Sequence, residues 1–285
     1  MKIVLRLSLF VLLCAVPLTA QTTFQPGKNV ITLRGQAQRL YFFPGAAIAS
    51  VQTHHRILFA PGDGGWRGFA ITMAAQLAAQ GNDVYALDTK HYLSSFTHGK
   101  SVLTPAAVMS DFHELAARIQ SQSSESQPAE KIILVGWSTG AGLTVLAAAH
   151  EDKTAYEGLI AVSLGKTNIL GWRCRDNLTY LTNQLPNEPT YQTENYLPQV
   201  TPLPIFVIQS SNDQFIPNEE AEALFIQTRH PKRFTLIHAH DHSFNGKRAE
   251  FFTALQQGLH WIAQHNRHAG KAPQAETIDL VAFPF

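Results

Sequence analysis

Residues 131–149 read KIILVGWSTGAGLTVLAAA, and this stretch decides the fold. Its first part consists almost entirely of Ile, Leu and Val, which is typical of a strand buried on both faces of a parallel sheet. Its second part is rich in Ala and Leu and predicts a helix over residues 139–150. Gly136 and Gly140 flank Ser138 at the point where the strand turns into the helix. We therefore expect a nucleophile elbow, in which a Cβ on either glycine would collide with the neighbouring strand or helix.

Strands and helices alternate on both sides of this stretch. We expect strands at residues 30–33, 40–43, 56–60, 83–88, 131–136, 158–163, 204–209 and 233–238, and helices at 69–80, 105–119, 139–150 and after residues 217 and 247. Apolar strands that alternate with helices indicate a mostly parallel central sheet flanked by helices, and with the elbow they predict the α/β-hydrolase fold. Residues from about 165 to 203 break this alternation and are expected to form an insertion over the sheet edge.

The two ends of the chain are expected to lie outside the folded domain. Lys2 and Arg6 precede an apolar stretch at residues 7–16, and Ala20 follows as the expected cleavage site, so residues 1–20 read as a signal peptide. About ten apolar residues are too few to span a bilayer. We therefore expect a periplasmic or secreted protein, with one α/β-hydrolase domain at residues 21–265 and a linker and tail at 266–285. Cys174 is then the single cysteine, so no internal disulfide is expected.

The charge balance argues against a nucleic-acid partner. Lys and Arg together number 22 against 21 for Asp and Glu, so no basic footprint is evident. Two glycine motifs that could bind a nucleotide phosphate also fail on spacing. Residues 62–67 lack the last glycine of G-x-G-x-x-G, and HGKS at 98–101 has Ser94 where a P-loop needs its first glycine. We therefore expect no cofactor.

A serine hydroxyl needs a histidine base and a carboxylate that orients this base, and on this fold they follow the serine in the order acid, then histidine. Asp213 comes just after the strand at 204–209, where such an acid belongs. Asp213 could instead be an ordinary turn residue. Asp241 is the other downstream aspartate, but as a sequence neighbour of the histidines it is badly placed to orient one. A serine at position 138 that only caps its helix is the alternative for the elbow itself.

The candidate base lies in HAHDHSFNG, residues 238–246. We choose His242, because it stands in the loop ahead of the helix that follows residue 247, and His240 is the second choice. His238, His240 and His242 would share one face of a strand, which raises a metal site as an alternative. No further ligand is evident at a matching spacing, so we expect no metal.

The glycine-rich stretch APGDGGWRG, residues 60–68, follows the strand at 56–60. In this fold, the loop at that position supplies one backbone N–H of the oxyanion hole, and the residue after the nucleophile supplies the other. The expected donors are therefore the main-chain N–H groups of Asp63 and Thr139. A carboxylate that faces an oxyanion would repel it, so the Asp63 side chain is expected to point away or to contact a cationic part of the substrate.

Three motifs resemble one family, the VirJ/AcvB-like α/β hydrolases, which are exported bacterial proteins first associated with virulence. They are GDGGWRG at 62–68, Leu87-Asp88 with Tyr92 shortly after, and GWSTGAG at 136–142. The resemblance covers roughly residues 56–265 and implies a triad of Ser138, Asp213 and His242. It also implies a link to type IV secretion and to hydrolysis of aminoacylated phosphatidylglycerol in the periplasm. The chain departs from the family in its Trp-Ser-Thr elbow and in the 165–203 insertion, and both bear on the substrate.

These observations predict an exported serine hydrolase that cleaves a carboxylic ester through an acyl-enzyme intermediate. The substrate is a lipid-headgroup ester, such as aminoacyl-phosphatidylglycerol, or a small-molecule ester, as for a carboxylesterase similar to dienelactone hydrolases. A third hypothesis is a non-catalytic partner in secretion that retains the fold. An apolar face of the insertion that reaches the membrane would favour the lipid. The sequence sets no oligomeric state.

Overall fold

The computed structural model describes residues 23–47, 54–97, 102–122, 130–178 and 187–269. Within them, eight strands form one sheet in the order β1-β2-β4-β3-β5-β6-β9-β10. Strand β2 is antiparallel to both of its neighbours, and the strands from β4 to β10 are parallel to one another. The predicted mostly parallel sheet is thus confirmed. The strands are β1 (Gly27–Leu33), β2 (Gln36–Phe43), β3 (Arg56–Ala60), β4 (Asp83–Leu87), β5 (Ile132–Trp137), β6 (Tyr156–Val162), β9 (Ile205–Ser210) and β10 (Lys232–Ile237).

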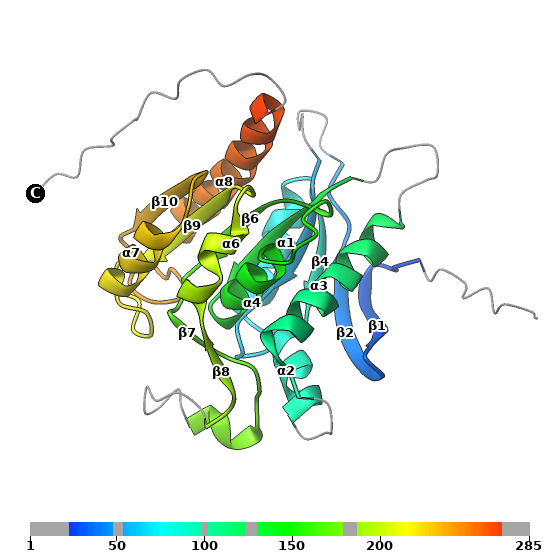
Figure 1. Ribbon diagram of the computed structural model, residues 1–285. Helices are drawn as coiled ribbons and strands as arrows, with labels where there is room; N and C mark the ends of the chain where they lie inside the picture. The colour runs from blue at the N-terminus through cyan, green and yellow to red at the C-terminus, as the bar shows by residue number, and fades with distance from the viewer. Residues whose placement is uncertain (1–22, 48–53, 98–101, 123–129, 179–186, 270–285) are drawn as a thin grey trace, which may run out of the picture.

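Helices cover both faces of this sheet, as the apolar strands require (Figure 1). Alternate residues of β3 show the two layers. Ile57 and Phe59 pack in one core with α1 (Phe69–Ala79) and α8 (Arg248–Ala269). Leu58 and Ala60 pack in the other core with α3 (Pro105–Gln120) and α4 (Thr139–Ala148). The remaining longer helices are α2 (Thr89–Thr97) and α7 (Asn218–Gln227).

A local signal explains where α3 begins. The side chain of Thr104 accepts a hydrogen bond from the N–H of Ala107 at 3.1 Å, and Pro105 opens α3, as expected of a capped start. Helix α8 continues to Ala269, so the linker expected from residue 266 does not begin there.

The insertion leaves β6 and returns to β9, which are neighbours within the sheet. Its described part contains β7 (Thr167–Ile169), η1 (Cys174–Leu178), β8 (Thr190–Gln192), η2 (Thr193–Asn195) and α6 (Leu197–Val200), and β7 pairs with β8. It packs beside α4 and α7. It is also tied to α2, because the N–H of Trp172 donates to the hydroxyl of Thr97 at 2.8 Å.

The predicted signal peptide at residues 1–20, and the tail beyond Ala269, lie outside the described residues. Among the residues that the structure does describe, no helix is both long and apolar enough to cross a membrane.

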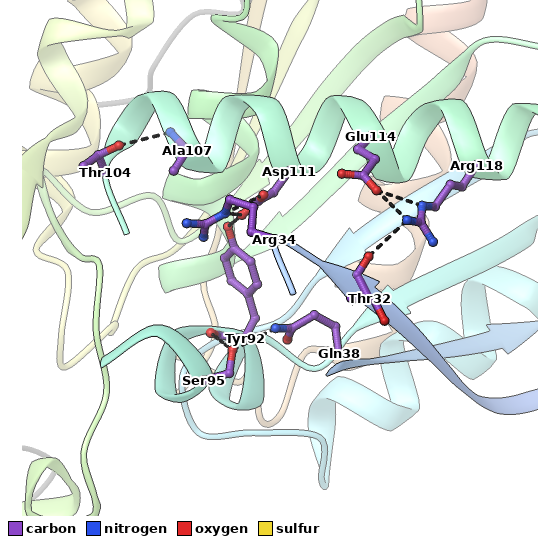
Figure 2. Close-up of polar contacts among 10 residues, drawn as sticks. All are labelled: Thr32, Arg34, Gln38, Tyr92, Ser95, Thr104, Ala107, Asp111, Glu114 and Arg118. Carbon is purple, nitrogen blue, oxygen red and sulfur yellow. Dashed lines mark hydrogen bonds and ion pairs between the residues drawn. The ribbon is translucent and has the colours of Figure 1, made fainter. Parts of the chain in front are cut away.

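A buried carboxylate joins the β1–β2 hairpin to α2 and α3 (Figure 2). Asp111 on α3 accepts hydrogen bonds from Arg34 Nε at 2.9 Å and from the hydroxyl of Tyr92 at 2.6 Å. The guanidinium of Arg34 also lies 3.8 Å from the centre of the Phe96 ring. Since the Asp111 side chain is only 2% exposed, these partners supply the hydrogen bonds that water cannot. Helix α2 is therefore fixed to the sheet and to α3 by polar as well as apolar contacts.

We predict that Asp111→Ala lowers the free energy of unfolding by about 3 kcal/mol, because it leaves the charge of Arg34 and the Tyr92 hydroxyl without their buried partner. Glu114→Ala on the same helix is the matched control. It removes the exposed ion pair with Arg118 and is expected to cost less than about 0.5 kcal/mol. Urea denaturation measures both values, and equal losses in the two variants would contradict the prediction.

Candidate active site

Ser138 stands between β5 and α4 in a backbone conformation that side chains rarely adopt, with φ 57° and ψ −127°. Such a conformation costs on the order of 1–3 kcal/mol and persists only where the surroundings impose it. The N–H of Ser138 donates to the carbonyl of Val162, at the end of β6, at 2.9 Å. Its side chain makes no capping hydrogen bond to α4. The geometry is that of a strained elbow and argues against a serine that only caps the helix.

The two glycines beside Ser138 stand where no side chain fits. A Cβ at Gly140 would lie 1.8 Å from the carbonyl oxygen of Ala60, and one at Gly136 would lie 2.4 Å from the hydroxyl of Thr144. Both distances are far below van der Waals contact. A side chain at either position would therefore collide with its surroundings, as the motif predicts.

Asp213 and His242 form a buried pair. His242 Nδ1 donates to Asp213 Oδ2 at 2.7 Å, and the other carboxylate oxygen accepts from the N–H groups of Phe215 and Ile216 at 3.0 and 3.1 Å. Burial raises the pKa of Asp213, but the hydrogen bond and charge of His242, with the backbone donor, more than offset this and hold the pKa below its ordinary value. Asp213 is therefore ionised at neutral pH. A neutral imidazole that donates from Nδ1 has its lone pair at Nε2, ready to accept a proton.

Trp137 connects this pair to the elbow. Its Nε1 donates to the backbone carbonyl of His242 at 3.3 Å, and the two rings lie 5.3 Å apart. On the other side, the N–H of His242 donates to the side chain of Gln214 at 3.1 Å. The end of β5 thus meets the loops that follow β9 and β10, which bring Asp213 and His242 to the residue that precedes Ser138. The contributions of Trp137 and Gln214 were not predicted from the sequence.

The alternative residues lie elsewhere. His238 and His240 are exposed, and the ring of His240 covers Gly246. The Asp241 carboxylate accepts hydrogen bonds from the N–H groups of Ser243 and Asn245, so it shapes its own turn. Within the described ranges, no group of three or more His, Cys, Asp and Glu side chains is arranged to hold a metal ion.

The glycine-rich loop after β3 touches the candidate nucleophile. A Cβ at Gly62 would lie 3.2 Å from the Cβ and 3.6 Å from the Oγ of Ser138. Asp63 is the next residue of this loop, and Thr139 is the first residue of α4. Each expected oxyanion donor is therefore next in sequence to a residue at this contact, Asp63 to Gly62 and Thr139 to Ser138, and their role as donors stays a prediction. Burial lowers the pKa of Lys90, and the charge of Asp63 partly opposes this, so the carboxylate lies near a cation of the protein itself.

Phe215 is a further candidate for substrate contact. It is 41% exposed, and its ring lies 5.2 Å from that of His242 in an edge-to-face arrangement. The sequence offers one signal for this role, because SNDQFIP places the aromatic Phe215 two residues after the candidate acid Asp213.

Known proteins share this fold and part of this sequence. Residues 55–177 match the family model described as bacterial virulence protein (VirJ). The uncharacterized protein YfhR of Escherichia coli O157:H7 is 26% identical over 227 residues, which cover 79% of this chain and 74% of YfhR.

Solved structures with the same fold are more distant in sequence. The α/β hydrolase GrgF from Penicillium sp. sh18 has a TM-score of 0.60 at 15% identity, over 85% of this chain and 99% of GrgF. XC6422 from Xanthomonas campestris, an α/β serine hydrolase without a lid, has a TM-score of 0.56 at 18% identity, over 84% of this chain and 96% of its own. The chain thus has the α/β-hydrolase fold, and its resemblance to VirJ-like proteins is confirmed over residues 55–177.

Proposed function

We propose that this protein is a serine hydrolase that cleaves carboxylic esters. The observation that supports it most is the buried Asp213–His242 pair at 2.7 Å, attached through Trp137 to a serine in a strained elbow. A serine, a carboxylate and a histidine in this chain order are the parts that nucleophilic catalysis on this fold uses. The VirJ match includes the elbow and the glycine-rich loop, because both lie within residues 55–177.

In the proposed reaction, the Oγ of Ser138 attacks the ester carbonyl carbon while His242 Nε2 takes the hydroxyl proton. The negative oxygen that forms on the carbonyl accepts hydrogen bonds from the N–H groups of Asp63 and Thr139. As the ester C–O bond breaks, His242 gives its proton to the leaving alcohol, and the acyl group stays on Ser138. Water then attacks this acyl-enzyme while His242 takes its proton. As the bond between the acyl group and Ser138 Oγ breaks, His242 returns the proton to Oγ and the acid leaves. Ionised Asp213 stabilises the imidazolium in both halves.

Labelling with a fluorophosphonate probe tests the proposed nucleophile, because such probes bond to activated serines. Wild-type protein is expected to be labelled and Ser138→Ala is not. Ser243→Ala, in the same loop as His242, is the matched control and is expected to be labelled like wild type. Failure of the wild type to react would contradict the hydrolase proposal and favour the non-catalytic partner, and a labelled Ser138→Ala protein would contradict the assignment of the serine.

Steady-state hydrolysis of a 4-nitrophenyl ester measures the contribution of the carboxylate. Asp213→Asn keeps an oxygen for the N–H groups of Phe215 and Ile216 but loses the charge that orients His242. We expect turnover to fall by a factor on the order of 10³–10⁴. The pKa of Asp213 lies below its ordinary value, so this carboxylate keeps its charge above about pH 4. We therefore expect protonation of Asp213 to lower wild-type activity only below about this pH.

The resemblance to VirJ/AcvB-like proteins supports a narrower proposal, in which residues 1–20 direct export to the periplasm and the substrate is aminoacyl-phosphatidylglycerol at the membrane surface. Vesicles that contain lysyl-phosphatidylglycerol test it. Wild-type protein is expected to release lysine from them, and Ser138→Ala is not. If the wild type hydrolyses soluble 4-nitrophenyl esters but leaves this lipid intact, the general carboxylesterase is the better description.

A further inference from the structure

Lys90 lies between the glycine-rich loop and the insertion. It stands in the first turn of α2, directly after β4. A Cβ at Gly65 would lie 3.0 Å from the Cδ of Lys90, so the lysine stem passes across the loop at a point without a side chain. The ammonium then lies 3.8 Å from the centre of the Trp172 ring. A cation at this distance from an indole face is attracted by the ring and loses freedom of movement.

The same loop connects Lys90 to the candidate nucleophile. Gly62 is in contact with Ser138, and the N–H of Gly65 closes a turn on the carbonyl of Gly62 at 3.4 Å. The turn at residues 62–65 therefore spans the distance from Ser138 to the stem of Lys90. In the sheet, β3 and β4 lie on one side of β5, and β9 and β10 lie on the other. Lys90 thus approaches Ser138 from the side opposite to Asp213 and His242.

A second cation lies close to Lys90. Arg67 belongs to the same loop, where its N–H donates to the carbonyl of Gly65 at 2.9 Å. Burial lowers the pKa of Lys90, and the charge of Arg67 lowers it further, while Asp63, Cys174 and Asp88 oppose this. Burial is the largest of these influences, so the ammonium of Lys90 is partly withdrawn from water, where its attraction for an anion is screened less than on an open surface.

The elements that hold Lys90 and Trp172 are fixed. On α2, Tyr92 donates to the buried carboxylate of Asp111, and Ser95 accepts a hydrogen bond from Gln38 at 2.8 Å (Figure 2). At the end of the same helix, Thr97 accepts the N–H of Trp172. A lysine on such a support is preorganised, which separates it from an ordinary surface lysine on a mobile side chain.

We infer that Lys90 and Arg67 form an anion-binding subsite beside Ser138, and that the substrate is an ester with a carboxylate or phosphate group. The inference rests on the proposed ester hydrolysis. An anion beside the two side chains interacts favourably with both charges, and the guanidinium of Arg67 offers a planar pair of donors that matches a carboxylate or a phosphate. The Asp63 carboxylate offsets part of this positive charge when no substrate is bound.

Matched ester pairs test the inference and show which part of the substrate holds the anion. In the first pair, 4-nitrophenyl hydrogen glutarate has a carboxylate on its acyl part, and 4-nitrophenyl pentanoate is its neutral counterpart. In the second pair, 4-phosphonophenyl butyrate has the anion on its alcohol part, and phenyl butyrate is neutral. We expect wild-type protein to show a higher kcat/KM for the anionic member of at least one pair. Lys90→Met, which keeps the apolar stem, is expected to lower this preference about 10- to 100-fold, the loss of one or two charge-assisted hydrogen bonds.

Three further variants sharpen the test. Arg67→Gln is expected to reduce the preference in the same direction as Lys90→Met. Asp63→Asn removes a negative charge beside Lys90 and is expected to increase the preference for the anionic ester. Lys28→Met, on the exposed edge strand β1, is the matched control and is expected to behave as wild type.

Fluorophosphonate labelling of each variant distinguishes failure of the anion-binding subsite from failure of the proposed ester hydrolysis. A labelled wild type without a preference for either anionic ester would overturn the subsite and leave the hydrolase proposal intact. A labelled Lys90→Met protein that retains the full preference would overturn it as well. A wild type that is neither labelled nor active would overturn the proposed function and the subsite together.

Discussion

The contact between the backbone of Gly140 and the carbonyl of Ala60 is the constraint on which the rest of the candidate site depends. A single Cβ at position 140 would lie 1.8 Å from that oxygen, so the elbow can lie against the end of β3 only because residue 140 has no side chain. Strands β3 and β5 are adjacent and pair Ala60 with Gly136, so the glycine-rich loop and the elbow leave the sheet side by side. The strained conformation of Ser138 and its contact with Gly62 both follow from this approach.

The parallel sheet brings the other parts to the same end of the molecule. Five residues of the proposed site follow parallel strands, whose carboxyl ends meet at one edge of the sheet. Asp63 follows β3, Lys90 follows β4 and Ser138 follows β5, while Asp213 follows β9 and His242 follows β10. The insertion after β6 reaches the same edge and places Trp172 over Lys90. In the proposed mechanism, the base and its carboxylate lie on one side of the serine, and the two cations lie on the other.

The sequence predicts the elements whose signal is local. The strand at 56–60 is predicted with its observed bounds because an apolar run ends there at Pro61 and Gly62, and Thr104-Pro105 marks the start of α3. Helix α2 was not predicted, because its sequence TKHYLSSFT is rich in Ser and Thr, which have weak helix propensity, and packing of Tyr92 and Phe96 stabilises it instead. Of the candidate site, the chain order of the fold points to Ser138, Asp213 and His242. The hydrogen bond from Trp137 to the His242 carbonyl and the contact of Lys90 with Trp172 join distant segments, and no local pattern indicates them.

The claim that unites these observations is that the glycine-rich loop binds a transient oxyanion through its main chain. A crystal structure of the protein with a phosphonate bonded to Ser138 tests it most directly, because the phosphonyl oxygen occupies the place of that oxyanion. We predict that this oxygen lies within about 3 Å of the main-chain nitrogens of both Asp63 and Thr139. A phosphonate whose oxygen accepts no hydrogen bond from the Asp63 nitrogen would contradict it.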